Sequence, residues 1–185
     1  VHGGDELSVS LLLLDGFVGR FADLKSGERQ ISQLHVAGDF VDLHGFTLKR
    51  LDHGLIALTA ARFGIVPHER LKALTEQNPH LTRLFWLMTN IDAAISREWE
   101  LSLGRRDALA RVAHLFCETF VRLEAVGLAE GRSCPFPLTQ AQIAECVGLT
   151  SIHLNRMVQE LRRQGLIQLR DRRLVIDDHG RLAAL

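Results

Sequence analysis

The side chains with the clearest chemical meaning are basic and gather near the C-terminus. Residues 150–174 hold six arginines against two acidic side chains, Glu160 and Asp171. Residues 1–78 hold eight basic and ten acidic side chains, and the whole chain has a formal net charge of zero. Guanidinium groups form charge-assisted hydrogen bonds with phosphate, so the C-terminal segment has the charge expected of a nucleic-acid-binding face.

The elements that would carry these arginines form a helix-turn-helix pattern. Thr139 and Gln142 form a capping box that predicts a helix through Val147. Gly148 is expected to end it, because glycine easily adopts the left-handed geometry of a tight turn. Thr150 is expected to cap a second helix that runs to about residue 164. Two short strands, Ile167–Leu169 and Leu174–Ile176, would then form a wing, which predicts a winged helix-turn-helix.

The first turns of such a second helix reach base edges in the major groove. Arg156 is the best candidate, because a guanidinium bound to guanine is the commonest specific contact. Ile152 offers apolar contact, for example to a thymine methyl, and Asn155 could pair with adenine or contact phosphate. The other candidate DNA-binding residues are Thr139, Thr150, Ser151, His153, Arg172 and Arg173. The alternative interpretations are plain helix caps for the hydroxyl residues, a solvated turn for the last two arginines, and a helical hairpin for the whole segment.

The N-terminal part predicts an antiparallel β-roll of the jelly-roll kind. Short runs of β-forming residues alternate with turn signals every 8–12 residues, as in sandwiches and barrels. The predicted strands are Leu7–Leu14, Phe17–Ala22, Arg29–Val36, Leu55–Thr59 and Arg62–Val66. Together with the C-terminal helices this gives an α+β fold class.

A long helix is expected to follow the β-roll. Pro67 can open a short helix, and Asn78-Pro79 can open a second one that meets no glycine or proline until Gly104. Within it an apolar stripe recurs at spacings of four, three and four residues: Leu84, Met88, Ile91 and Ile95. This stripe is typical of a coiled-coil seam, which predicts a homodimer, although it could be only the core face of a single helix. A hinge is expected at residues 104–107, followed by a helix to about Val126.

Length and composition agree with this organisation. The chain has 185 residues, with 46% hydrophobic and 24% charged side chains, which excludes disordered and fibrous classes. We expect a β-roll domain at residues 1–78, a dimerisation helix at 79–104 and a winged helix-turn-helix domain at 105–185. No signal peptide or membrane-spanning stretch is evident, so a cytoplasmic protein without a membrane partner is expected. The first residue is Val1, which favours a trimmed chain.

Histidines and cysteines offer weaker alternatives. His35, His44 and His53 lie near the predicted sheets, but their spacing of nine residues matches no metal-ligand signature, so no metal site is predicted. Solvated or structural histidines are the favoured interpretation. Cys117 is expected in a core, and Cys134, in a Ser-Cys-Pro loop, is expected to be exposed and the better redox candidate. A metal- or redox-responsive regulator, or a β-roll metalloprotein with a helical partner-binding domain, stays as the alternative.

In order and spacing, these motifs resemble the Crp/Fnr family of bacterial transcription regulators over nearly the whole chain. The similar segments are Leu14–Val18 (L-D-G-F-V), Leu34–Phe40 (L-H-V-A-G-D-F), Asn78–Leu81, Ala110–Ala113 (A-R-V-A) and Leu138–Arg156. The resemblance implies a homodimer that binds a palindromic site on double-stranded DNA, contacts RNA polymerase and is not an enzyme.

The resemblance also locates an effector pocket, in which this chain departs from the family's cyclic-AMP binders. Those proteins have a Glu for the ribose and an Arg-Ser pair for the cyclic phosphate. Here Leu43 stands at the position of the Glu, and His53-Gly54 at the position of the Arg-Ser pair. The candidate pocket residues are Asp42, Leu43, His44, His53 and Gly54. Without the arginine, cyclic AMP bound in the usual way is not expected, and the identity of any cofactor or effector is left open.

Overall fold

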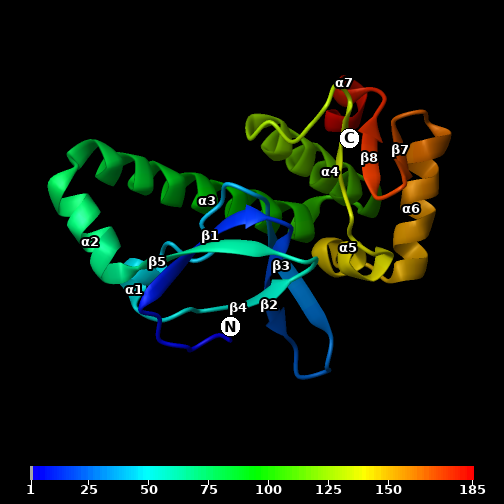
Figure 1. Ribbon diagram of the computed structural model, residues 1–185. Coiled ribbons are helices and arrows are strands. Elements are labelled where there is room, and N and C mark those ends of the chain that lie inside the picture. Colours follow the sequence, from blue (N-terminus) through cyan, green and yellow to red (C-terminus); the bar gives the residue numbers. More distant parts are fainter. Residues whose placement is uncertain (1) are drawn as a thin grey trace.

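The computed structural model describes residues 2–185. An N-terminal β-roll of two antiparallel sheets lies beside a long helix, and a helical domain with a small sheet follows (Figure 1). One sheet pairs β1 with β5, and the other has the order β3-β2-β4. The strands are β1 (Val9–Asp15), β2 (Val18–Asp23), β3 (Arg29–His35), β4 (Gly54–Ala57) and β5 (Arg62–Pro67). All five predicted strands are present, within two residues at each end.

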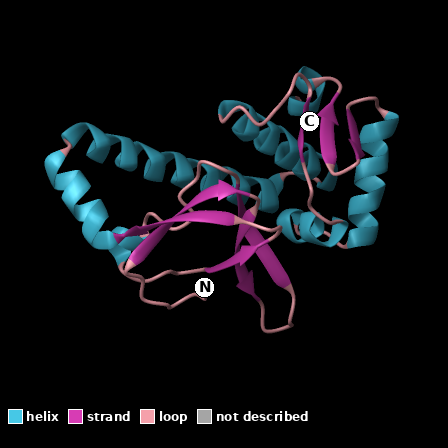
Figure 2. Ribbon diagram, in the orientation of Figure 1, coloured by secondary structure: helices cyan, strands magenta, loops and turns pink. Residues whose placement is uncertain are grey.

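The helices and the C-terminal sheet follow in chain order (Figure 2). The helices are α1 (Gly45–Leu48), α2 (His68–Gln77), α3 (Pro79–Arg105), α4 (Ala108–Ala125), α5 (Gln140–Val147), α6 (Ser151–Arg163) and α7 (His179–Ala183). Three short strands pair in the order β6-β8-β7. Their bounds are β6 (Ser133–Pro135), β7 (Ile167–Arg170) and β8 (Arg173–Ile176). The predicted wing is therefore β7 and β8, whereas α1, β6 and α7 were not predicted.

The long helix α3 differs from its prediction at both ends. The side chain of Asn78 does not cap it; its amide nitrogen donates instead to the Leu74 carbonyl oxygen at 3.1 Å, because α2 ends directly before it. The helix also continues through Gly104 to Arg105, so the expected interruption begins two residues later. Asp107 then caps α4, accepting a hydrogen bond from the Ala110 amide at 2.9 Å.

One hydrophobic core joins the β-roll to the helical domain. Phe17 of the β-roll lies edge-on to Phe136 at a centroid distance of 6.4 Å, and Phe136 lies edge-on to Phe116 of α4 at 5.3 Å. Polar contacts reinforce this packing: the Gln30 amide donates to the Glu145 carbonyl oxygen of α5 at 2.7 Å. In this conformation α5 is thus held against β3. The division of the chain at residues 78 and 104 stays a prediction.

The cysteine prediction was wrong for Cys134. This side chain is fully buried, because β6 pairs with the central strand β8 of the C-terminal sheet. Cys134 is therefore a core residue. Its burial raises the pKa of the thiol to about 11, which makes it a poor redox candidate. Cys117 packs, partly buried, against the main core, as expected. Over residues 2–185, no helix is long and apolar enough to cross a membrane.

Candidate nucleic-acid interface and sensor cleft

The helix-turn-helix has the local geometry that its capping residues dictate. The Thr139 hydroxyl accepts from the Gln142 amide at 3.3 Å, while the Gln142 side chain accepts from the Thr139 amide at 2.8 Å. Gly148 ends α5 in the left-handed conformation, with φ of 63°. The Thr150 hydroxyl then caps α6 by accepting from the His153 amide at 3.2 Å. These caps fix the start of α6.

Helix α6 buries one face in the core. The opposite face, which carries the predicted base-contacting residues and is called the reading face below, is exposed. Leu154, Val158 and Leu161 are buried in the core shared with α4 and α5. The candidates Ser151, Ile152, His153, Asn155 and Arg156 are all exposed, and the side chain of Ile152 is 70% exposed. An apolar side chain so exposed at a helix start is available for contact with another molecule.

Four of these residues line one open depression: Ser151, Ile152, Asn155 and Arg156. Gln140, the first residue of α5, lines it too. Sequence reasoning missed Gln140, although its place directly after the capping Thr139 was a usable signal. Arg156 makes no hydrogen bond or ion pair with any other described residue, whereas Arg163 is paired with Glu160 at 2.6 Å. Arg156 is therefore free to bind a partner from this depression.

The wing gives less support to its two candidate arginines. Asp171 and Arg172 form the tight turn, both with positive φ (51° and 59°). Arg173 lies partly buried on β8, and its Nε donates to the Ser133 hydroxyl at 2.8 Å. Arg172 is exposed but lines a depression shared with Asp15 of the β-roll. In this conformation the wing tip faces the β-roll, so Arg172 and Arg173 stay predictions.

The predicted effector-pocket residues lie together but play different parts. Asp42 is buried, and its carboxylate accepts from the Leu11 amide at 2.7 Å; burial raises the pKa of Asp42 to about 6. Gly54 is required by packing, because a Cβ there would lie 2.5 Å from the Phe21 ring. These two residues support the β-roll, whereas the side chains of Leu43, His44 and His53 line cavities.

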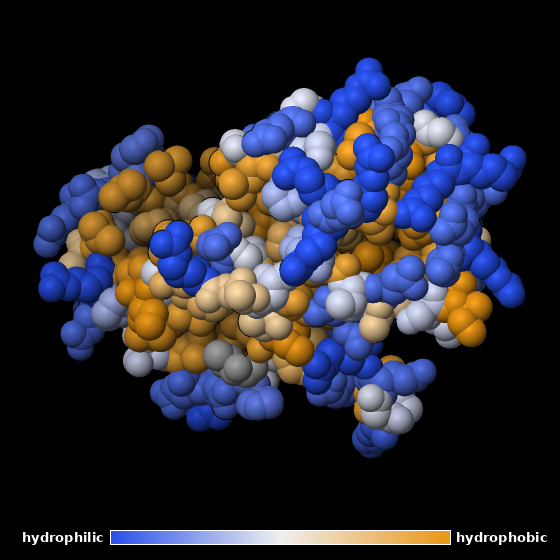
Figure 3. Space-filling model, turned by 45° about the vertical axis from the view of Figure 1, so that its right-hand side comes forward, coloured by the Kyte–Doolittle hydropathy of each residue, from blue (hydrophilic) through white to orange (hydrophobic). Residues whose placement is uncertain are grey.

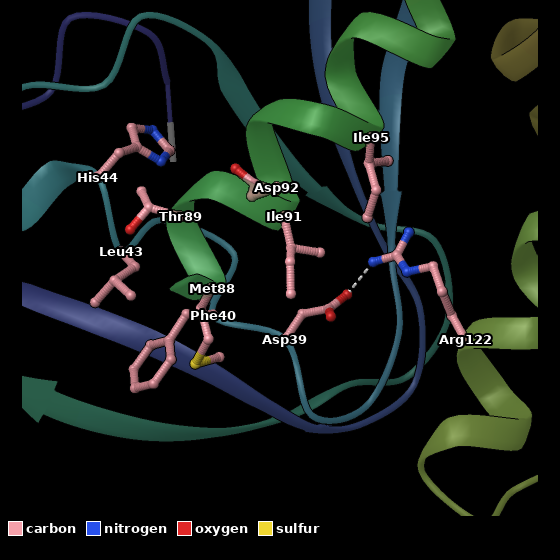
Figure 4. Close-up of a pocket in the computed structure, with 10 residues that line it drawn as sticks. All are labelled: Asp39, Phe40, Leu43, His44, Met88, Thr89, Ile91, Asp92, Ile95 and Arg122. Atoms are coloured by element: carbon pink, nitrogen blue, oxygen red, sulfur yellow. Dashed lines mark hydrogen bonds and ion pairs between the residues drawn. The ribbon is translucent and has the colours of Figure 1, made fainter. Parts of the chain in front are cut away.

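Two cavities meet along α3. The smaller, about 200 Å³, lies between the loop at Asp39–His44 and the side chains of Met88, Ile91 and Ile95 (Figure 4). At one end of it Arg122 of α4 is paired with Asp39, while His44 lies at the other end. The second is an open cleft of about 580 Å³ between the β-roll and α3, which we call the sensor cleft. Its lining includes Arg20, Gln33, His44, Asp52, His53, Asp92, Ser96 and Trp99.

The arginine of the sensor cleft that lies on the β-roll, Arg20, is already bound by protein groups. The Arg20 guanidinium donates to Asp92 at 2.8 Å, to Gln33 at 2.9 Å and to the Val41 carbonyl oxygen at 3.0 Å. It is therefore occupied by protein groups rather than turned toward a ligand phosphate. Burial lowers the pKa of His44 to about 4 and also lowers that of His53, so both rings are neutral at pH 7.

The predicted dimer stripe is only partly exposed. Leu84 and Ile91 are 40% and 51% exposed, whereas Met88 and Ile95 are half-buried beside the smaller cavity. Additional large apolar side chains are exposed on α3: Trp86, Leu87 and Leu101. Hydrophobic residues predominate over the β-roll and α3 in Figure 3, and hydrophilic residues over the C-terminal domain. The exposed apolar face of α3 therefore includes Leu87 beside Leu84 and Ile91, and the dimer stripe stays a prediction.

A β-roll, a long connecting helix and a winged helix-turn-helix define a class of DNA-binding regulators, and the comparisons agree. Residues 110–185 match the Crp-like helix-turn-helix domain family. The transcriptional activator protein FnrL of Cereibacter sphaeroides is 26% identical over 98% of this chain and 74% of its own length. A probable transcriptional activator of Rhizobium leguminosarum bv. viciae is 29% identical over 97% of this chain and 74% of its own length.

Solved structures show the same fold. FixK2 from Bradyrhizobium japonicum superposes with a TM-score of 0.86 at 24% identity, covering 100% of this chain and 90% of that one. TTHB099 from Thermus thermophilus, a regulator of the CRP family, has a TM-score of 0.73 at 19% identity, covering 100% and 92%. Residues 110–185 form a Crp-like helix-turn-helix domain, and the whole chain is similar in sequence and fold to transcription regulators of the Crp/Fnr family.

Proposed function

We propose that this regulator binds a palindromic DNA site as a homodimer, with the first turns of α6 in the major groove. The observation that carries the proposal is the open depression formed by Ser151, Ile152, Asn155 and Arg156 on an otherwise well-capped helix. Two copies related by a two-fold axis would address half-sites one helical turn apart. In this proposal Thr139, Thr150 and His153, at or near the helix starts, contact phosphates.

The test is DNA selection from a random duplex pool, followed by fluorescence anisotropy on the selected duplex. Arg156→Ala is expected to weaken binding about tenfold to 100-fold and to relax the preference at one base pair. Arg105→Ala, which removes an exposed arginine at the end of α3, is the matched control and should leave base preference unchanged. Equal affinity and equal base preference for Arg156→Ala and the wild type would contradict the proposed reading face.

The dimer interface is the exposed seam of α3. Leu84, Leu87 and Ile91 are each 40% exposed or more and lie on neighbouring turns, so two copies of α3 would cover them. Met88 and Ile95 would border the interface and connect it to the smaller cavity. We also propose contact with RNA polymerase and action in the cytoplasm, which the similarity to Crp/Fnr regulators supports.

An effector of this regulator would bind between the β-roll and α3, because both cavities are lined by both elements. The pairing of Arg20 with Asp92 supports an effector other than cyclic AMP bound in the usual way. A redox signal at the cysteines has less support, because Cys134 and Cys146 are buried and burial raises the pKa of both thiols.

A further inference from the structure

Two histidines that are nine residues apart in the sequence lie side by side at the rim of the sensor cleft. The rings of His44 and His53 have a centroid distance of 5.1 Å. Asp52 lies between them: its Oδ1 is 2.6 Å from His53 Nδ1 and 3.9 Å from His44 Nε2. We propose that His44, Asp52 and His53 form a binding site for a divalent transition-metal ion such as Zn²⁺.

The donor set suits such an ion. Zinc is bound by imidazole nitrogen and carboxylate oxygen at about 2.0–2.2 Å, and sites with three protein ligands leave a fourth position open. One ligand atom from each of the three residues lies within 4.8 Å of the other two. Ligands of a tetrahedral ion are about 3.3 Å apart at these bond lengths, so small side-chain rotations would close the site.

The two rings also lack other partners. His44 Nε2 and His53 Nε2 are both buried, and neither makes a hydrogen bond with another described residue. A buried nitrogen without a partner costs free energy, and a metal ion would satisfy it. Asp52, by contrast, is exposed and sits at the mouth of the site, so an ion has a path from solvent.

The surrounding charges are compatible with a cation. The charged groups acting on His44 and His53 are the carboxylates of Asp52 and Asp92 and the guanidinium of Arg20. The positive charge of Arg20 is already paired with Asp92, which leaves the Asp52 carboxylate to balance the ion. The open coordination position would face the sensor cleft, beside Thr89 and Asp92 of α3. An ion here would thus lie between the β-roll and the dimerisation helix.

The test is a Zn²⁺ titration of tag-free, EDTA-treated full chain by isothermal calorimetry. The wild type is expected to bind one ion per chain at this site, with a dissociation constant of about micromolar or tighter. His44→Gln and His53→Gln should each weaken that binding at least about tenfold, and the double variant should abolish it. His80→Gln, which changes an exposed histidine at the start of α3, should bind like the wild type.

Two further measurements keep the outcome independent of folding and of DNA binding. Circular dichroism in the absence of metal should give the same spectrum for the wild type and the histidine variants. Co²⁺ added to the wild type should give the visible absorption of a four-coordinate ion, and the double variant should not. Absence of Zn²⁺ binding by the wild type, or binding that the folded double variant retains, would overturn the proposal.

Discussion

The ion pair between Arg20 and Asp92 is expected to hold α3 on the β-roll, and Arg20→Met tests this directly. Arg20 on β2 is only 7% exposed, and methionine retains most of its aliphatic stem. The substitution leaves Asp92 with a single side-chain donor, the Gln33 amide at 2.7 Å. It also removes both guanidinium hydrogen bonds to the Val41 carbonyl oxygen, at 3.0 Å and 3.3 Å.

Breaking a buried ion pair by removing one partner costs about 3–5 kcal/mol. The Asp92 side chain is 24% exposed and can regain some hydration, so we expect the low end, about 3 kcal/mol. With a urea slope of about 2 kcal/mol/M, the midpoint of unfolding should fall by about 1.5 M. Asp92→Asn should also destabilise, and a double-mutant cycle should show coupling of about 1 kcal/mol or more.

The matched control is Arg29→Met. Arg29 has an equally close partner, with its Nε 2.8 Å from Asp23 Oδ1, but this pair lies exposed on the β2–β3 hairpin. Exposed pairs are screened by water, so the urea midpoint should hardly change. All variants are compared at one protein concentration, because dimerisation would otherwise shift the midpoint. If Arg20→Met lowered the midpoint no more than Arg29→Met, the buried pair would contribute nothing to the attachment of α3.

Three other outcomes are expected. Leu87→Glu with Ile91→Glu should give monomers in sedimentation equilibrium, because both side chains are exposed on α3; a persisting dimer would place the interface elsewhere. Leu154→Ala, which truncates a fully buried side chain under the reading face, should lower the free energy of unfolding by about 2–5 kcal/mol in urea. Burial lowers the pKa of His35 from 6.5 to about 4 in the folded chain. Between these two pH values the unfolded chain binds more protons than the folded chain. The stability of the wild type should therefore fall as the pH drops from 6.5 to about 4. His35→Leu should remove up to about 3 kcal/mol of that fall, and equal pH profiles would show that His35 does not stay neutral.

The parts of the fold that the sequence predicted best are those set by neighbouring residues. The capping box at Thr139, the left-handed Gly148 and the cap at Thr150 each depend on residues within one helical turn, so their types alone predict the outcome. The prediction that Asn78 caps α3 was wrong, also for a local reason: the C-terminal end of α2 lies directly before this residue. Its amide binds the Leu74 carbonyl oxygen of α2 rather than the start of α3.

Features that depend on distant pairing were missed. Cys134 is buried because β6 pairs with β8, some forty residues later in the chain, and a three-residue strand leaves no periodic signal. His44 and His53 gave no recognisable ligand spacing, yet the loop between α1 and β4 brings their rings together. The apolar stripe of α3 was found by its spacing, but which of its members face solvent depends on where the β-roll covers the helix.

The contacts between the β-roll and the helical domain show how a signal in the cavities could reach α6. Trp99 of α3 donates to Glu118 of α4 at 2.7 Å, Glu118 accepts from Arg122 at 2.9 Å, and Arg122 is paired with Asp39 of the β-roll. Asp39 and Arg122 line the smaller cavity, and Trp99 lines the sensor cleft. A ligand in either cavity would therefore touch this chain of hydrogen bonds directly. It could change the placement of α6 only by binding one arrangement of the chain more tightly than another.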